Sequence, residues 1–192
     1  MTPRMGLDKQ TILLAAIEIA DKHGLEAVTL ANLAKKLTVR SPSLYNHIEG
    51  LAGLRKELAL HGLNELYNDL AKVKGERSKE DAIHTFADSY IAFVRSHPGL
   101  YELTLIAPNP KDTAIQVASK KIVDQTLNLL KDYNLEEETA LHVVRGIRSI
   151  LHGFASLEQK GGFGLPLDLD KSIHLVIDHF LAGMENVKDK EK

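Results

Sequence analysis

Residues 29–48 read TLANLAKKLTVRSPSLYNHI, and this stretch decides the fold of the N-terminal part of the chain. Thr29 can accept a hydrogen bond from a free backbone N–H, which predicts the start of a helix of about two turns. Ser41 is a favoured N-cap and Pro42 is tolerated at the first helical position, so a second short helix is expected from there to about Ile48. Two short helices joined by a tight turn predict a helix-turn-helix unit.

Helical periodicity continues on both sides of this stretch. Upstream, apolar residues share one face over residues 12–20, and Gly24 is the expected stop. His97-Pro98-Gly99 is expected to end a helix, and the segments 72–79 and 161–166 are expected to be loops. Further helices are predicted at about 51–71, 82–95, 113–131, 136–159 and 170–184. We therefore predict an all-α protein of about nine helices, with a helix-turn-helix unit within residues 1–48.

Composition excludes several classes of protein. The 192 residues are 44% hydrophobic and 26% charged, which is typical of a globular protein. The absence of cysteine excludes disulfides, thiolate metal sites and a cysteine nucleophile. No apolar run approaches the roughly 18 residues that a membrane span needs, so we expect a cytoplasmic protein with no membrane contact. The net charge of −2 argues against a uniformly basic nucleic-acid coat.

Residues 8–58 resemble the helix-turn-helix region of the tetracycline-repressor (TetR) family. The resemblance rests on Leu-x-Val at 37–39 and on Leu-Tyr-x-His at 44–47. The C-terminal part resembles a subgroup of that family through Arg145, Arg148, His152-Gly153-Phe154 and Leu157-Glu158. The resemblance implies an all-α transcriptional regulator that binds double-stranded DNA as a homodimer. It implies a helix-turn-helix DNA-binding domain at residues 1–48 and a ligand-sensing and dimerisation domain at residues 49–192. Such proteins are usually repressors that a small-molecule effector releases from the operator.

The expected recognition helix supplies the candidate DNA contacts. Its first turn faces base edges in the major groove, which places Arg40 and Ser43 to reach bases or phosphates. The resemblance implies that Tyr45 and His47 donate to phosphates and only position the protein. Alternatively, Tyr45 is a half-buried aromatic and His47 a plain surface residue. The full set of predicted DNA-binding residues is Thr29, Arg40, Ser41, Pro42, Ser43, Tyr45, Asn46 and His47.

Two positions depart from the family pattern. Thr38 stands where the family commonly has glycine, and a β-branched residue in a left-handed turn would be strained. Residues 48–51 lack the phosphate-binding lysine that family members carry after the histidine. Arg55 or Lys56 could replace this lysine. We nevertheless expect DNA binding to depend less steeply on salt than is usual for the family.

The last two predicted helices carry apolar stripes wide enough for a four-helix bundle with a second copy. The alternative is that these stripes close the core of a single chain. The predicted interface residues are Val143, Ile147, Phe154, Ile173, Val176, Ile177, Phe180 and Met184.

Weaker signals concern ligands and chemistry. Tyr90, Tyr101, His142 and Arg145 are candidate effector contacts, with packing, or for Arg145 an ion pair with residues 136–138, as the alternative. The nine histidines lack His-Glu-x-x-His spacing, so we expect no metal site, no cofactor and no enzymatic activity. The rival hypothesis is an all-α enzyme or metal-binding protein that uses histidine and carboxylate groups of the body.

Overall fold

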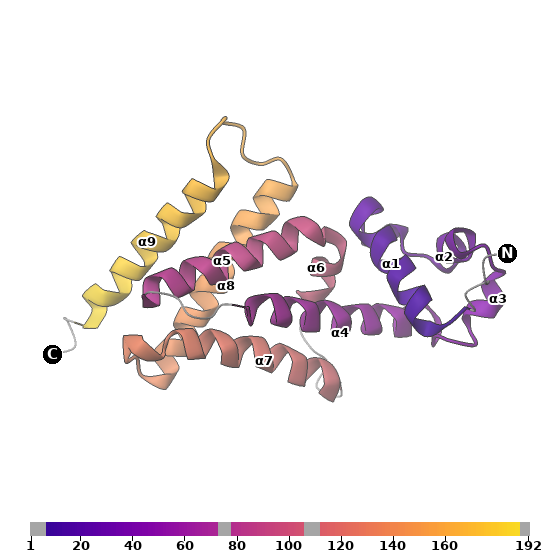
Figure 1. Cartoon of the computed structure of the whole chain (residues 1–192), viewed down its shortest axis with the longest axis horizontal. Coiled ribbons are helices and arrows are strands. Elements are labelled where there is room, and N and C mark those ends of the chain that lie inside the picture. Colours follow the sequence, from indigo (N-terminus) through magenta and orange to yellow (C-terminus); the bar gives the residue numbers. More distant parts are fainter. Residues whose placement is uncertain (1–6, 73–77, 106–111, 189–192) are drawn as a thin grey trace. The chain divides into compact units, whose positions relative to one another are not determined.

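The computed structural model describes residues 7–72, 78–105 and 112–188, with side chains to residue 184, and every regular element in these ranges is a helix (Figure 1). The all-α prediction and the expected number of helices are confirmed. The elements are α1 (Lys9–His23), η1 (Leu25–Ala27), α2 (Leu30–Leu37), α3 (Ser41–Leu44), α4 (Gly50–Leu70), α5 (Lys79–Ser96), α6 (Pro98–Thr104), α7 (Thr113–Leu129), η2 (Lys131–Tyr133), α8 (Glu137–Gln159) and α9 (Leu169–Lys188).

The chain forms two compact units. The first unit comprises Met1–Glu65 and Ser96–Ala118, and the second comprises Leu66–Arg95 and Ser119–Lys192, as far as these ranges are described. The first unit therefore contains α6 as well as the three helices of the expected head. The functional division at residues 48 and 49 stays a prediction.

The core of the head follows the sequence pattern. Leu33 and Leu44 are fully buried and Ile48 is 7% exposed, as predicted. Leu37 and Val39, which the same pattern placed in the core, are only half-buried. At the start of α1, Asp8 accepts a hydrogen bond from the Thr11 backbone N–H at 2.7 Å, and this bond lowers the pKa of the Asp8 carboxyl. Gly24 ends α1 with φ 81°, as expected.

The turn between α2 and α3 holds the unusual threonine in a left-handed conformation. Thr29 caps α2 by accepting from the Asn32 N–H at 3.1 Å. At the other end, Thr38 has φ 56° and ψ 41°. The next N–H, that of Val39, reaches back to the Ala34 carbonyl at 2.9 Å, which closes a Schellman turn. The strain expected at Thr38 is therefore present, and the fold accommodates it.

The predicted start and end of α3 are wrong. α3 covers only Ser41–Leu44, and its N-cap is Arg40 without a side-chain cap, so Ser41 is the first helical residue and Pro42 the second. After Leu44 the N–H groups of Tyr45 and His47 bond the carbonyls three residues back, so the chain continues as a turn and not as a regular α-helix. α6 was not predicted, since the Pro98-Gly99 pair was interpreted only as a stop, whereas proline also suits the first turn of a helix.

α5 also begins earlier than predicted. Its first residue is Lys79, and the preceding Ser78 caps the helix by accepting through Oγ from the Asp81 N–H at 3.0 Å. Residues 73–77 of the predicted loop lie outside the described residues.

Within the first unit, α1 and α6 meet through a carboxylate and a glycine. Asp21 Oδ1 accepts from the backbone N–H groups of Gly99 and Leu100 at 3.1 and 3.0 Å, and Asp21 Oδ2 lies 3.0 Å from Nδ1 of His97. A Cβ added at Gly99 would lie 2.2 Å from the backbone carbon and oxygen of Ala20. Only glycine permits this approach, and Asp21 supplies the cap that the α6 N-terminus otherwise lacks.

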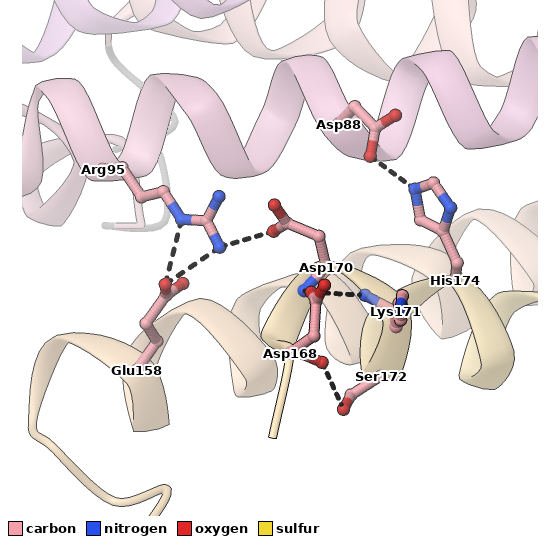
Figure 2. Close-up of polar contacts among 8 residues, drawn as sticks. All are labelled: Asp88, Arg95, Glu158, Asp168, Asp170, Lys171, Ser172 and His174. Carbon is pink, nitrogen blue, oxygen red and sulfur yellow. Dashed lines mark hydrogen bonds and ion pairs between the residues drawn. The ribbon is translucent and has the colours of Figure 1, made fainter. Parts of the chain in front are cut away.

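In the second unit, α8 and α9 form a hairpin, and one arginine of α5 bonds both of its helices (Figure 2). Arg95 of α5 bonds Glu158 of α8 through Nε at 3.0 Å and Asp170 of α9 through an Nη at 2.7 Å, and these bonds raise the pKa of Arg95. Asp168 caps α9 by accepting from the N–H groups of Asp170 and Lys171. The glycine-rich segment 161–166 between α8 and α9 is non-helical, as predicted.

Replacing Thr38 by glycine should raise the free energy of unfolding by about 0.5–1 kcal/mol, because relief of the left-handed strain exceeds the added chain entropy of the unfolded state. Urea unfolding measures the change. As the matched control, Thr29→Ala should lower the free energy of unfolding by about 1 kcal/mol through loss of a cap. A lower free energy of unfolding for the Thr38→Gly variant than for the wild type would contradict the strain at Thr38.

Gly99→Ala should lower the free energy of unfolding by about 3 kcal/mol, because the methyl group cannot fit against the α1 backbone. Thermal unfolding of this variant is compared with that of Gly164→Ala, since a Cβ at Gly164 meets nothing within 4 Å. Equal melting temperatures for the two variants would show that the close approach of α1 and α6 is not a constraint.

Candidate nucleic-acid interface

The residues around α3 divide into an anchored side and an open side. Leu44 and Ile48 are buried and fix the segment on the rest of the head. The predicted contact residues lie on the open side to different degrees. Arg40, Pro42, Tyr45 and Asn46 are exposed, whereas Thr29, Ser41, Ser43 and His47 are half-buried. The structure thus brings residues 40–47 onto one short segment that a nucleic acid could approach.

Tyr45 is the most informative of these residues. Its side chain is 60% exposed, so the alternative of a half-buried packing aromatic is wrong. An aromatic ring this open contributes little to the core, and its hydroxyl can donate to a phosphate. His47 is half-buried, and its alternative as a plain surface residue stays open.

Thr29 combines a structural and an interfacial role. Because its oxygen accepts from Asn32, its hydroxyl hydrogen remains available to an outside acceptor. The Asn32 amide donates to the Ala27 carbonyl at 2.8 Å, which fixes the start of α2 on η1. The N-terminus of α2 is therefore held rigidly beside residues that could meet a phosphate backbone.

The two candidates for the missing phosphate-binding lysine are both engaged. Lys56 Nζ lies 2.9 Å from a carboxylate oxygen of Asp112, and this contact raises the pKa of Lys56. Arg55 lies 3.8 Å from Glu26, and its Nε is buried without a hydrogen-bond partner in the described part of the chain. Each cation therefore has a carboxylate neighbour, and the expected shallow salt dependence stays a prediction.

Sequence reasoning missed a basic groove between α1 and α2. This open groove has a volume of about 470 Å³. Lys36 on its wall bonds Glu18 at 2.6 Å, and this hydrogen bond lowers the pKa of Glu18. The lining residues are Glu18, Ile19, Lys22, His23, Ala27, Asn32, Lys35 and Lys36. The only sequence signal was the basic pair at the end of each helix, and basic residues there are also explained by the helix dipole.

The candidate effector contacts are divided between the two units and differ in exposure. Tyr101 is 2% exposed in the first unit, and Tyr90 is 4% exposed in the second. His142 and Arg145 are exposed on α8, and His142 lies 3.9 Å from Glu138. Arg145 makes no hydrogen bond or ion pair among the residues that the structure describes, so the expected pairing with residues 136–138 is absent there. These two exposed side chains are not enclosed by their own chain.

Half of the predicted interface residues belong to the core of one chain. Ile147, Ile173, Ile177 and Met184 are at most 7% exposed, so they pack inside the second unit and offer no surface to a partner. The helical stripes contained both core and surface positions, which sequence periodicity does not separate. Val143, Phe154 and Phe180 are half-buried, and Val176 is 44% exposed. The interface itself stays a prediction.

No group of three or more histidine, aspartate and glutamate residues that could hold a metal ion occurs within the described ranges. No helix there is long and apolar enough to cross a membrane.

Comparisons with known proteins agree with this geometry. The family described as "Tetracyclin repressor-like, C-terminal domain" matches residues 83–180. The chain is 41% identical to the uncharacterized HTH-type transcriptional regulator YobS of Bacillus subtilis, over 96% of each chain. It is 28% identical to the uncharacterized HTH-type transcriptional regulator Rv0681 of Mycobacterium tuberculosis, over 93% of this chain and 82% of that protein.

Solved structures share the fold. A Rhodococcus protein of unknown function matches with a TM-score of 0.80 and 20% identity, over 95% of this chain and 98% of that one. TetR from Acinetobacter baumannii matches with a TM-score of 0.69 and 20% identity, over the same shares of the two chains.

Substitutions on the open side of α3 should separate two kinds of contact. Arg40→Ala should change which base pair is preferred, at about 1–3 kcal/mol for a lost base contact, whereas Tyr45→Phe should weaken binding to all duplexes alike. Fluorescence anisotropy on single-base variants of a selected duplex measures both, with His142→Ala in the second unit as the control. An altered base preference in Tyr45→Phe would overturn its role.

Proposed function

We propose that this chain, which belongs to the tetracycline-repressor (TetR) family of transcriptional regulators, is a repressor that binds a palindromic operator as a homodimer. A small-molecule effector releases it from the DNA. Residues 1–48 read the operator, and residues 49–192 sense the effector and form the dimer in the cytoplasm. One observation carries the proposal: the 60% exposed ring of Tyr45 stands on an anchored segment whose other outward residues are polar, cationic or small.

The positions of residues in and after α3 suggest which of them contact bases and which contact phosphates. Arg40 and Ser43 belong to the part that enters the major groove, so they are assigned to base readout. Tyr45 and His47 follow in the turn after α3, where they hold phosphates and set the depth of insertion. Buried Leu44 resists displacement of the segment, so a phosphate held by Tyr45 fixes the position of Arg40.

The effector acts by a shift between two states. Only a ligand with different affinity for the DNA-competent and the released conformation can move the equilibrium. Among the candidate contacts, Tyr90 and Tyr101 are buried, each in a different unit, and each stays a candidate effector contact of its own unit. His142 and Arg145 are withdrawn from this role because their side chains are exposed.

The dimer is assigned to the exposed parts of α8 and α9. Their exposed apolar residues are Leu141, Leu157, Leu175 and Val176. A second copy that covers these residues would remove apolar area from water and give an interface with two-fold symmetry. Two heads held at a fixed separation then match two half-sites of an operator.

The alternative of a metal-binding protein or enzyme has less support. The histidines that α5 and α9 place side by side bond carboxylates of the opposite helix. His84 Nε2 lies 2.7 Å from Asp178, and His174 Nε2 lies 2.7 Å from Asp88. These contacts engage the Nε2 atom of each imidazole within the fold, whereas Nδ1 of His84 is buried without a hydrogen-bond partner among the described residues.

Selection of bound fragments from a genomic library should yield an inverted repeat, with half-sites separated by about 34–36 Å or a small multiple of this distance. The purified chain should also protect that repeat in a footprint. The Tyr45→Phe and Arg40→Ala double variant is the control for specific binding. Enrichment of no repeat, or equal enrichment by the double variant, would contradict the proposed function.

A further inference from the structure

Each helix of the α8–α9 hairpin carries an exposed strip of three residues in which an apolar side chain separates two opposite charges. The α8 strip consists of Glu138, Leu141 and Arg145, and the α9 strip consists of Lys171, Leu175 and Asp178. Their spacing of three and four residues places each strip along one face of its helix. Leu141 is 41% exposed and Leu175 is 57% exposed, so neither leucine is covered by its own chain.

The charges of the two strips are poorly compensated within one chain. Glu138 is 91% exposed, with only the His142 ring 3.9 Å away. The side chains of Arg145 and Lys171 make no hydrogen bond or ion pair in the ranges 7–72, 78–105 and 112–184. Asp178 is 58% exposed, and its partner is the imidazole of His84, which is charged only when protonated.

Another carboxylate of α9 differs in this respect. Asp170 faces the permanently charged guanidinium of Arg95 at 2.7 Å, so its charge is already balanced. Among the described side chains of α9, up to residue 184, Asp178 is therefore the carboxylate with charge to offer a partner.

The two strips cannot meet within one chain. α8 and α9 run in opposite directions as a hairpin (Figure 1). Their mutual contact uses other positions, because a Cβ at Gly146 of α8 would lie 3.0 Å from the ring of Phe180. Gly146 and Phe180 lie on the faces by which the two helices contact each other. Both strips lie on other faces of their helices and are exposed.

Read along the chain, the α8 strip is acidic, apolar and basic, whereas the α9 strip is basic, apolar and acidic. The charged residues are seven positions apart in both strips, so two parallel helices can align both opposite-charge pairs at once. A second copy of this chain presents both strips, and two-fold symmetry makes each contact occur twice.

Resting on the homodimer of the proposed function, we propose that the α9 strip of a second copy lies parallel to the α8 strip, with Glu138 against Lys171 and Arg145 against Asp178 of that copy. Leu141 and Leu175 fill the space between the two ion pairs. The leucines supply apolar burial, and the charges fix the alignment and favour an identical chain over relatives with another charge order. Arg145 thus acts in dimer selection and not in effector binding.

Exchange of the charges within one strip tests this arrangement without changing the net charge. The α8-swapped variant carries Glu138→Lys and Arg145→Glu, and the α9-swapped variant carries Lys171→Glu and Asp178→Lys. Each alone should dimerise more weakly, with the dissociation constant raised on the order of 30-fold, because four attractive pairs become repulsive. Sedimentation equilibrium at about 0.15 M salt measures the constants.

Recombining the swapped strips should restore the dimer. An equimolar mixture of the two variants should form heterodimers in native mass spectrometry, and the chain with all four substitutions should dimerise like the wild type. The control exchanges Lys131→Glu with Asp132→Lys, two exposed residues of η2, and should leave the dissociation constant unchanged. If loss of the His84 contact unfolds the α9-swapped variant, Glu138→Lys and Lys171→Glu are mixed instead.

The outcomes separate this inference from the proposed function. A wild-type dimer whose dissociation constant is unaffected by the α8 swap, or equally affected by the η2 control, overturns the strip pairing and leaves the homodimer in place. A four-substitution chain as weak as the α8-swapped variant also overturns the pairing. A wild-type chain that is monomeric with and without operator DNA overturns the homodimer itself.

Discussion

The carboxylate of Asp21 joins the end of α1 to the start of α6, and the rest of the first unit depends on this joint. α6 has seven residues, too few for a stable helix by itself, and its N-cap residue provides no side-chain cap. The free N–H groups are satisfied from α1 instead, at a separation that only Gly99 allows. A movement of α6 would therefore carry α1 with it, and the proposed effector could act on the helix-turn-helix through this joint.

The head separates stability from recognition. Leu33, Leu44 and Ile48 provide the buried contacts, so Arg40 and Tyr45 are free to face outward. The strained turn at Thr38 is tolerated because hydrogen bonds on both sides determine its conformation. A rigid, small unit of this kind suits a proposed reader of DNA, since fixed side chains lose little entropy on binding.

The second unit combines a fixed hairpin with an open outer surface. Arg95 joins both helices of the hairpin to α5, and the crossed pairs of His84 with Asp178 and His174 with Asp88 add further links between α5 and α9. The exposed leucines and charges outside these links are what a partner could contact. In the proposed dimer, the alignment of these strips would set how the second units of two copies lie against each other.

The sequence alone determined the helical class, the capped helix at Thr29 and the buried positions Leu33 and Leu44, because these follow from local periodicity and capping. Tertiary structure alone decided which apolar residues of α8 and α9 are core: periodicity treats Ile177 and Val176 as neighbours on one stripe, whereas packing buries the first and exposes the second. α6 was also beyond the sequence, since its start is stabilised by Asp21, 78 residues away from Gly99. Local patterns cannot show where a distant carboxylate will satisfy a helix end.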